Sequence, residues 1–448
     1  MKRILALFAL LLIASTSIVL PQSEAGAIFL LIAPGARAGG MGEAQVAIAD
    51  DAYASYWNPA GLGFLKGSEF GFMHVNWLPN LADDIYYEFF AGRHHIPMLG
   101  TVGGHLIFLN LGEQIRTDEE NNQLGTFTSY MMAVTGSYST LLSHKSSIGL
   151  NAKVSYQHLA EIGAGAEKGK GTSIDFGFDI GYLNKSFLSD RLTLGLVVSN
   201  IGPKVDFIDP AQGDPQPTNL TLGLNFKLID TEYNKINIVY DLNKMLVAAY
   251  PDMDWDGDYS VGGYDEDGNF TPEGEYNEAG QLEVAHKDPI YLAIFTSWVD
   301  DWLLGGDIDI SSSAGEADRE IGGYEWQDTN GDNIVDADEV SKTDEFEPGE
   351  VGWGKYNADG KLEVGSGKKR TMMNEIDKLI HNIGFEYWYS SYFAIRGGMI
   401  YDKTGKIFNP TFGVGLRFAD YGFDFGYISG SPGHPLTNTM RFSLNWVF

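Results

Sequence analysis

Residues 37–65 read RAGGMGEAQVAIADDAYASYWNPAGLGFL, a stretch crowded with glycine and alanine. Small side chains let backbone pack closely against other surfaces, but they give little intrinsic preference for helix or strand. The stretch closes on Asn58-Pro59-Ala60-Gly61, where the proline keeps the residue before it out of the helical region and favours a turn. These features predict a compact peptide wedged into a cavity that the rest of the chain provides.

Strict alternation of apolar and polar residues predicts that the rest of the chain is made of strands. In residues 174–182, IDFGFDIGY, every even position is apolar and every odd one is Asp or Gly. Residues 220–228 and 423–427 repeat the pattern. One such segment fits a soluble sandwich as well as a membrane barrel, because both give a strand one apolar and one polar face.

Three further features favour a membrane barrel. Many alternating segments are about 9–12 residues long, which is the length that a tilted strand needs to cross a bilayer. Residues 1–27 have the features of a secretory signal peptide. The chain ends MRFSLNWVF, an alternating strand with a terminal Phe448, which resembles the assembly signal of outer-membrane barrels. Strands are therefore predicted near residues 68–77, 84–94, 99–113, 127–142, 147–160, 172–183, 191–201, 218–229, 235–245, 380–390, 392–402, 409–419, 421–429 and 437–448.

These fourteen predicted strands make an even number, as closed bacterial barrels require. Short turns at 143–146 and 419–422 are expected on the periplasmic side, and longer loops at 114–126, 161–171 and 202–217 on the outside. Residues 290–311 leave two interpretations open: a further hairpin that would give sixteen strands, or part of an extracellular cap. Their apolar residues run continuously instead of alternating, which favours the cap.

Composition limits the function. The 448 residues include 13% aromatic residues and 55 glycines but no cysteine, so disulfides and thiolate chemistry are excluded. The formal net charge of −30 weighs against a nucleic-acid partner, whose phosphates would be repelled. In the signal peptide, Lys2 and Arg3 precede an apolar run, and Ala25-Gly26-Ala27 fits the cleavage rule, with Ser23-Glu24-Ala25 as a competing site.

Several motifs carry a resemblance to a known family. They are the glycine-rich run, the pair Asp50-Asp51 and WNPAGL at 57–62, followed by LADDIYYEF at 81–89, SNIGPK at 199–204, PTNLTLGL at 217–224, DLNKMLV at 241–247 and FEYWY at 385–389. Together they resemble the plug and barrel of FadL-like outer-membrane proteins, in particular the PorV/PorQ family. The resemblance covers roughly residues 35–248 and 380–448.

The resemblance implies a transmembrane antiparallel β-barrel in the outer membrane of a Gram-negative cell. It divides the chain into a signal peptide (1–27), a plug (28–66) with the motif Asn58, Pro59, Ala60 and Gly61, and a barrel (67–448) interrupted by an acidic extracellular insertion (249–378). It further implies a non-enzymatic role in type IX secretion, in which the protein binds and shuttles cargo that bears a C-terminal secretion domain. Its partners would be membrane lipid, secreted cargo and other secretion components. The alternative is a FadL-like transporter of hydrophobic small molecules.

The acidic insertion departs from the family pattern. Residues 250–370 hold 31 of the chain's 60 acidic residues against 8 basic ones. One segment in it fits a twelve-residue calcium loop, because hard oxygen ligands recur at the required positions and Asn333 replaces the usual glycine. Its predicted Ca²⁺ ligands are Asp328, Asn330, Asp332, the carbonyl of Ile334, Asp336 and Glu339. The alternative is a metal-free acidic loop. Residues 252–258 are a second, poorer calcium candidate, because Gly263 stands where the bidentate Glu belongs.

Charged residues on the polar strand face are expected to point into the barrel lumen. Charges persist there only when they are paired or hydrated. We therefore expect them to pair with one another and with Arg37, Asp50 and Asp51 of the plug; a polar substrate path is the other interpretation. The residues concerned are Asp175, Asp179, Lys227, Asp241, Glu386, Arg396, Arg417, Asp424 and Arg441. No arrangement of residues with catalytic spacing is found.

Overall fold

The computed structural model describes residues 25–82, 84–117, 123–160, 171–207, 213–250, 286–300, 372–430 and 437–448, together with five short strands between residues 320 and 363. The chain divides into two compact units. The barrel unit comprises residues 25–247 and 378–448, and the insertion unit includes residues 248–377.

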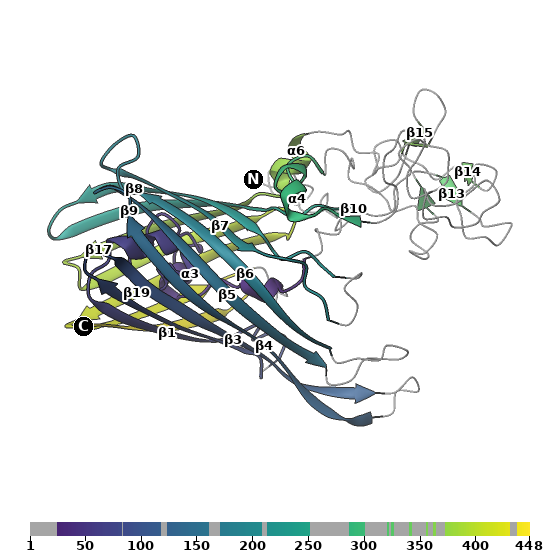
Figure 1. Ribbon diagram of the computed structural model, residues 1–448, viewed down its shortest axis with the longest axis horizontal. Helices are drawn as coiled ribbons and strands as arrows, with labels where there is room; N and C mark the ends of the chain where they lie inside the picture. The colour runs from purple at the N-terminus through teal and green to yellow at the C-terminus, as the bar shows by residue number, and fades with distance from the viewer. Residues whose placement is uncertain are drawn as a thin grey trace, which may run out of the picture. The chain divides into compact units, whose positions relative to one another are not determined.

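The barrel unit is a closed antiparallel barrel of fourteen described strands, in which each strand pairs with its neighbours in chain order (Figure 1). β9 pairs with β17 across the insertion, and β1 pairs with β21 to close the ring. The predicted number of strands is confirmed. The strands are β1 (Ser68–Asn76), β2 (Tyr86–Ile96), β3 (Gly100–Thr117), β4 (Gln123–Leu141), β5 (Ser146–Ala160), β6 (Gly171–Asn184), β7 (Leu192–Ile201), β8 (Asn219–Asp230), β9 (Asn234–Met245), β17 (Ile380–Tyr389), β18 (Phe393–Asp402), β19 (Ile407–Phe418), β20 (Tyr421–Ile428) and β21 (Thr439–Val447).

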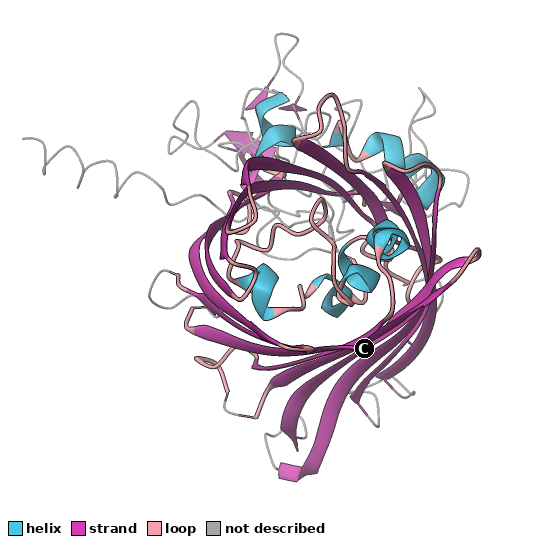
Figure 2. Ribbon diagram, turned by 90° about the vertical axis from the view of Figure 1, so that its left-hand side faces the viewer, coloured by secondary structure: helices cyan, strands magenta, loops and turns pink. Residues whose placement is uncertain are grey.

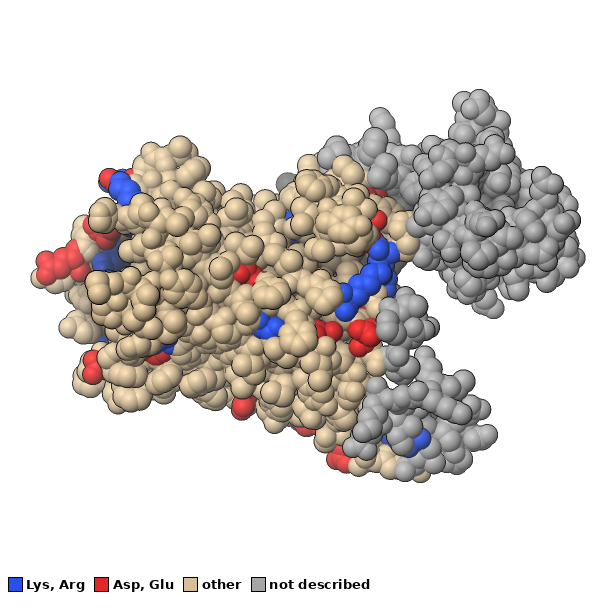
Figure 3. Space-filling model, in the orientation of Figure 1, with Lys and Arg blue, Asp and Glu red and all other residues tan. Residues whose placement is uncertain are grey.

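Burial along the strands is the reverse of that in a soluble protein. On β6, Phe176 and Phe178 are each 56% exposed, whereas Asp175 and Asp179 are 4% and 2% exposed. Figure 3 shows a barrel surface mostly without Lys, Arg, Asp or Glu. An apolar outer face around a polar interior is the pattern of a transmembrane barrel, so the alternation in the sequence marks lipid-facing positions.

Aromatic residues gather in two bands, as expected where a barrel wall meets the membrane surfaces. One band includes Phe70, Trp446 and Phe448, whose rings lie 4.7–6.3 Å apart. The other includes Tyr86, Phe108 and Tyr130, which succeed one another on β2, β3 and β4 at about 6 Å between centroids. The two bands lie toward opposite ends of the strands.

The two ends of the barrel differ in their connections. We call the end that carries the chain's last residue the C-terminal end; it has the short turns at 97–99, 142–145, 231–233, 390–392 and 419–420. The insertion lies between β9 and β17 at the opposite end, which we call the insertion end. Here the predicted loop at 114–126 is wrong, because β3 continues to Thr117 and β4 begins at Gln123.

Residues 25–66 lie inside the barrel, and Figure 2 shows their short helices surrounded by the strands. We call this segment the plug. It contains η1 (Ile28–Leu31), α2 (Ala36–Gly39), α3 (Ala54–Trp57) and η2 (Pro59–Phe64). Near its start, the amide of Gly26 donates to the carbonyl of Pro215 at the insertion end, and its last residues lead into β1 at the C-terminal end. The plug therefore runs the length of the lumen.

The insertion unit has a small described core. β10 (Ala249–Tyr250) pairs with β11 (His286–Lys287), and Tyr250 packs with Ala248 and Ala293 of α4 (Ile290–Thr296). Because residues 290–296 are helical, the alternative of a further barrel hairpin there is wrong. The remaining described elements are β12 (Glu320–Ile321), β13 (Tyr324–Trp326), β14 (Val340–Lys342), β15 (Lys355–Tyr356), β16 (Leu362–Glu363) and α6 (Met372–Asp377).

None of the helices in the described part of the chain is long and apolar enough to cross a bilayer.

Candidate functional site: the plug and its charged cavities

The Asn-Pro-Ala-Gly motif fastens the plug to the wall. The fully buried Asn58 amide donates to the carbonyls of Val46 and Tyr182, both at 3.1 Å, and its oxygen accepts from the amide of Ala60 at 3.1 Å. Pro59 opens η2 directly after this cap, where its missing N–H costs nothing. One side chain thus joins two parts of the plug to β6.

The wall receives the motif through small residues. The hydroxyls of Ser139 on β4 and Ser147 on β5 both donate to the carbonyl of Ala60, at 3.2 and 2.6 Å. A side chain at Gly149 would place its Cβ only 2.2 Å from the carbonyl carbon of Pro59. The plug backbone therefore lies directly against the wall, and at position 149 of β5 the distance allows only glycine.

The glycine-rich run makes a second backbone contact on the opposite wall. Gly40 lies against Gly413 of β19, where a Cβ would be 2.7 Å from the neighbouring Cα. Gly42 has a φ of +65° and lies against β17 and β18, a conformation that favours glycine. Its amide donates to the Thr411 hydroxyl at 2.8 Å. These contacts explain why the run is composed of the smallest residues.

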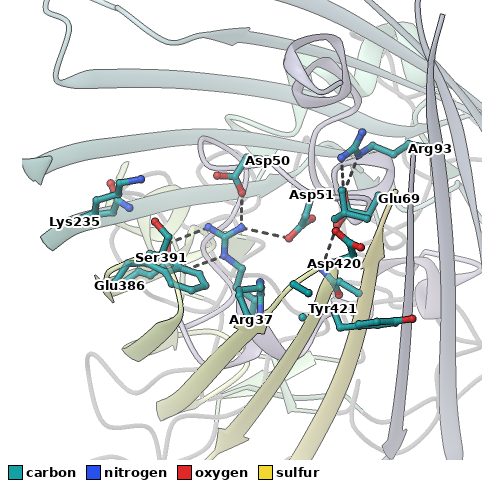
Figure 4. A pocket seen from close by; sticks show the side chains of 17 residues that line it. Arg37, Asp50, Asp51, Glu69, Arg93, Lys235, Glu386, Ser391, Asp420 and Tyr421 are labelled. Atoms are coloured by element: carbon teal, nitrogen blue, oxygen red, sulfur yellow. Dashed lines mark hydrogen bonds and ion pairs between the residues drawn. The ribbon is translucent and has the colours of Figure 1, made fainter. Parts of the chain in front are cut away.

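Arg37 of α2 is the centre of an ion-pair network (Figure 4). Its guanidinium makes two parallel hydrogen bonds to Glu386 of β17, at 2.9 and 3.0 Å, and also contacts Asp50 and Asp51 of the plug, the latter at 3.3 Å. A bidentate arginine–carboxylate pair is among the strongest polar contacts in proteins. Burial raises the pKa of Asp51 above its ordinary value, while the charge of Arg37 opposes that shift.

The network continues along the wall with alternating charge. Glu386 also accepts from Arg396 of β18 at 2.9 Å, Arg396 donates to Asp424 of β20 at 2.7 Å, and Arg417 of β19 pairs with Asp424 at 2.8 Å. The guanidinium groups of Arg396 and Arg417 each lie 5.2 Å from the ring of Trp388. Each buried charge therefore has an opposite partner, which offsets part of its desolvation cost.

The other luminal charges fall into three groups. Asp179 pairs with Lys153 at 2.8 Å, and Arg441 pairs with Glu43 of the plug. Asp241 instead accepts from the backbone amides of Gln45 and Val46, at 2.7 and 2.8 Å, and Asp175 accepts from the Ser173 hydroxyl. Among the described residues, the side chain of Lys227 has no hydrogen-bond or ion-pair partner. Sequence reasoning identified Asp179 and Arg441 but not their partners, Lys153 and Glu43. The signal that could have found these partners is a charged residue at an inward-facing strand position or in the plug.

An apolar cluster closes the side of the plug that faces β1, β2 and β3. Tyr53 stacks on Phe89 at 5.3 Å between centroids, and Tyr56 lies edge-on to both Trp57 and Phe89. The cluster also includes Phe29, Leu30, Leu62, Met73 and Tyr87, all at most 3% exposed. The plug is thus held by apolar packing on this side and by ion pairs on the other.

Two cavities lie beside the plug toward the C-terminal end. The first has a volume of about 360 Å³ and is lined by charged residues that include Arg37, Asp51, Arg93 and Glu386 (Figure 4). The second, of about 230 Å³, shares Asp50, Lys235 and Asn237 with it. Arg93 pairs with Glu69 at 2.8 Å. Both cavities combine charged and amide-bearing residues with apolar ones, such as Val447 in the first and Leu183 in the second.

The predicted calcium ligands Asp328, Asn330, Asp332, Ile334, Asp336 and Glu339 lie outside the described residues, as does the second candidate at 252–258. The calcium site therefore stays a prediction. The plug motif is described: Asn58, Pro59 and Ala60 make the contacts given above, and the amide of Gly61 donates to the carbonyl of Asn58 at 2.9 Å.

Comparison with known proteins places the chain in a family. Residues 22–252 match the family model described as type IX secretion system protein PorV. Similar solved structures include the toluene transporter TbuX of Ralstonia pickettii, with 11% identity, a TM-score of 0.41 and coverage of 93% of this chain and 97% of that one. A FadL homologue of Pseudomonas aeruginosa has 9% identity, a TM-score of 0.40 and coverage of 92% and 98%. A search of curated proteins found no match.

Proposed function

Because the chain belongs to the PorV family of type IX secretion system proteins, we propose that this outer-membrane barrel is a non-enzymatic component of type IX secretion. In this role it binds secreted cargo that carries a C-terminal secretion domain and carries it to later steps at the cell surface. Its partners are the cargo, other secretion components and the lipid of the outer membrane.

The attachment of the plug on several sides is the observation that supports this role over transport. Asn58 joins it to β6, Arg37 joins it to β17 through Glu386, and Arg441 of β21 pairs with Glu43 of the plug. A transporter of hydrophobic molecules needs an apolar path past its plug, whereas charged residues stand among the apolar ones in both cavities beside this plug. Because the plug occupies the lumen, the outer surface and the loops are the parts of the barrel that can contact partners.

The ribbon formed by β3 and β4 is the proposed cargo contact. Among the described strands, residues 113–117 and 123–128 pair only with each other, because β2 stops pairing at Asn110 and β5 at Tyr130. Both outer edges of this ribbon therefore lack a neighbouring strand in the described part of the chain, although the amide of Glu113 donates to the Asp84 carboxylate at 3.0 Å. Such edges accept a strand from another protein. The ribbon lies at the insertion end, which we place outside the cell because short turns are periplasmic in bacterial barrels.

The test is a pull-down of the tagged barrel from gently solubilised outer membranes, with every co-purifying protein identified. The ribbon variant replaces residues 111–129 by Asn-Gly, a turn that suits the paired residues Asn110 and Tyr130. The control replaces residues 403–406 by the same turn between the paired residues Asp402 and Ile407, at the same end of the barrel.

We expect secreted proteins that share one C-terminal domain to be recovered with the wild type and the control, but not with the ribbon variant. Equal recovery of cargo with the ribbon variant would show that cargo binds at another loop. Recovery of lipid or fatty acid without any secreted protein would overturn the secretion role and favour the transporter.

A further inference from the structure

The second cavity holds a group of lysines that the plug network does not use. It lies between residues 47–50 of the plug and the inner face of β6 to β9. Lys185, Lys227 and Lys235 all line it, together with Asn225 and Thr193. Strand pairing gathers these residues, because Thr193 is opposite Asn225 and Lys227 is opposite Asn237. The cavity shares Lys235 and Asn237 with the larger one, so both lie toward the C-terminal end.

These lysines differ from the arginines of the network because none of them has an ion-pair partner among the described residues. Lys185 lies over the ring of Phe64, with its Nζ 4.2 Å from the ring centroid. Lys235 is opposite Asp230 in the β8–β9 register, yet no ion pair joins them. The carboxylate of Asp50, which also lines the cavity, is held by Arg37.

The lysine charges act on one another. Burial lowers the pKa of Lys185 below its ordinary value; the charge of Asp50 opposes this shift, and the smaller effect of the positive charge of Lys227 adds to it. Two carboxylates, Asp50 and Asp230, also line the cavity, but neither forms an ion pair with these lysines. Mutual repulsion of ammonium groups in a partly enclosed space is relieved when an anion enters.

A buried amide completes the lining. Asn225 is 3% exposed, and its side-chain oxygen has no hydrogen-bond partner among the described residues. An unsatisfied buried acceptor is costly unless a donor reaches it. The occupant of the cavity must therefore supply acceptor oxygens to the lysines and a donor to Asn225. A hydrogen phosphate or a phosphate monoester with a nearby hydroxyl carries both kinds of group, whereas chloride and carboxylate supply only acceptors.

We propose that this cavity is a phosphate-binding site, in which Lys185, Lys227 and Lys235 hold the anionic oxygens and Asn225 accepts a hydrogen bond from a hydroxyl of the ligand. The site is open toward the C-terminal end of the barrel and is independent of the cargo contact at the insertion end. The same chemistry is offered by a free phosphorylated solute and by the headgroup of a phospholipid.

The test measures binding of inorganic phosphate to the full-length barrel in detergent by isothermal titration calorimetry at low salt, after delipidation. The variants are Lys227→Gln, Lys235→Gln and the double variant. The matched control is Lys145→Gln, which removes an exposed lysine paired with Asp190 on a turn at the same end of the barrel but outside the cavity. Heat-modifiable migration in gels verifies that each variant is a folded barrel.

We expect a saturable phosphate site in the wild type, a loss of affinity of about tenfold in each single variant because one charged hydrogen bond is removed, and no measurable binding in the double variant. Chloride at the same ionic strength should compete weakly. Absence of phosphate binding in the wild type, or an equal loss in Lys145→Gln, would overturn the proposal.

A second arm separates the two sources of phosphate. Vesicles that contain phosphatidylglycerol are added as competitor, and lipid that co-purifies with the wild type and the double variant is quantified. Competition by vesicles, with less bound lipid in the double variant, assigns the site to a lipid headgroup. Binding of inorganic phosphate that vesicles do not displace assigns it to a soluble phosphate. Cargo recovery in the pull-down should be unchanged in all three cavity variants, so failure of this proposal is distinguishable from failure of the secretion role.

Discussion

Replacement of Glu386 by Gln should loosen the plug without unfolding the barrel. The Glu386 side chain is fully buried and accepts three hydrogen bonds, two from Arg37 and one from Arg396, at 2.9–3.0 Å. Gln keeps the shape but removes the negative charge and one acceptor. Breaking a buried ion pair costs about 3–5 kcal/mol. Because Arg37 keeps Asp50 and Asp51, and Arg396 keeps Asp424, we expect a value near the lower limit.

A loss of about 3 kcal/mol raises the population of plug-released molecules by about 100-fold, since each 1.4 kcal/mol is a factor of ten. The absence of native cysteines makes this measurable. A Ser55→Cys reporter lies in α3 at 0% exposure, so a bulky maleimide reaches it only when the plug leaves its place. The labelling rate in Glu386→Gln should rise by a factor of that order.

The matched control is Asp190→Asn on the same reporter background. It also removes one partner of an ion pair, but the side chains of Lys145 and Asp190 are 62% and 86% exposed, and exposed pairs contribute little. Labelling should then remain at the wild-type rate. If Glu386→Gln also labels at that rate, the network does not hold the plug, and the packing of Tyr53 and Phe89 must do so instead.

Three other predictions use the same reporter or the full chain. Asn58→Ala removes three hydrogen bonds at a fully buried position and should destabilise the seated plug by about 3 kcal/mol, seen as faster labelling; an unchanged rate contradicts the role of the motif. Gly149→Ala places a Cβ 2.2 Å from the plug backbone and should also speed labelling, whereas Gly136→Ala, with no atom within 4 Å, should not; equal rates in the two would contradict the close-contact explanation. Calcium titration of the full chain should show a site that Asp328→Ala together with Glu339→Ala abolishes, and binding that survives the double substitution rejects the assigned loop.

The strands were predictable because the membrane imposes a simple rule on them. A strand between lipid and lumen must alternate, so Phe176 and Phe178 face outward while Asp175 and Asp179 face inward. The rule fails where a strand leaves the membrane. In the ribbon at 113–117, the sequence EQIRT has polar residues on both faces, and a two-sided polar strand has the composition of a loop. The predicted loop at 114–126 was wrong for this reason.

The plug was predictable as a segment but its contacts were not. Glycine, alanine and Asn58-Pro59 indicate close backbone packing in any setting, and they do not say which wall is contacted. The partners are distant in the chain: Arg37 meets Glu386 across 349 residues, and Gly40 meets Gly413. Only the order of strands around the closed barrel brings β17 and β19 to the face on which α2 lies. A list of luminal charges therefore predicts that pairs exist without predicting which pairs.

Pairing in the lumen also separates structural charges from functional ones. Arg37, Arg396 and Arg417 alternate with carboxylates, so their charges are explained by holding the plug and the wall together. Lys227 and Lys235 lie in the same lumen, within a chain that has two acidic residues for every basic one, and still have no ion-pair partner among the described residues. Because an unpaired charge in a confined site carries a cost, its presence there indicates a partner that the chain itself does not contain.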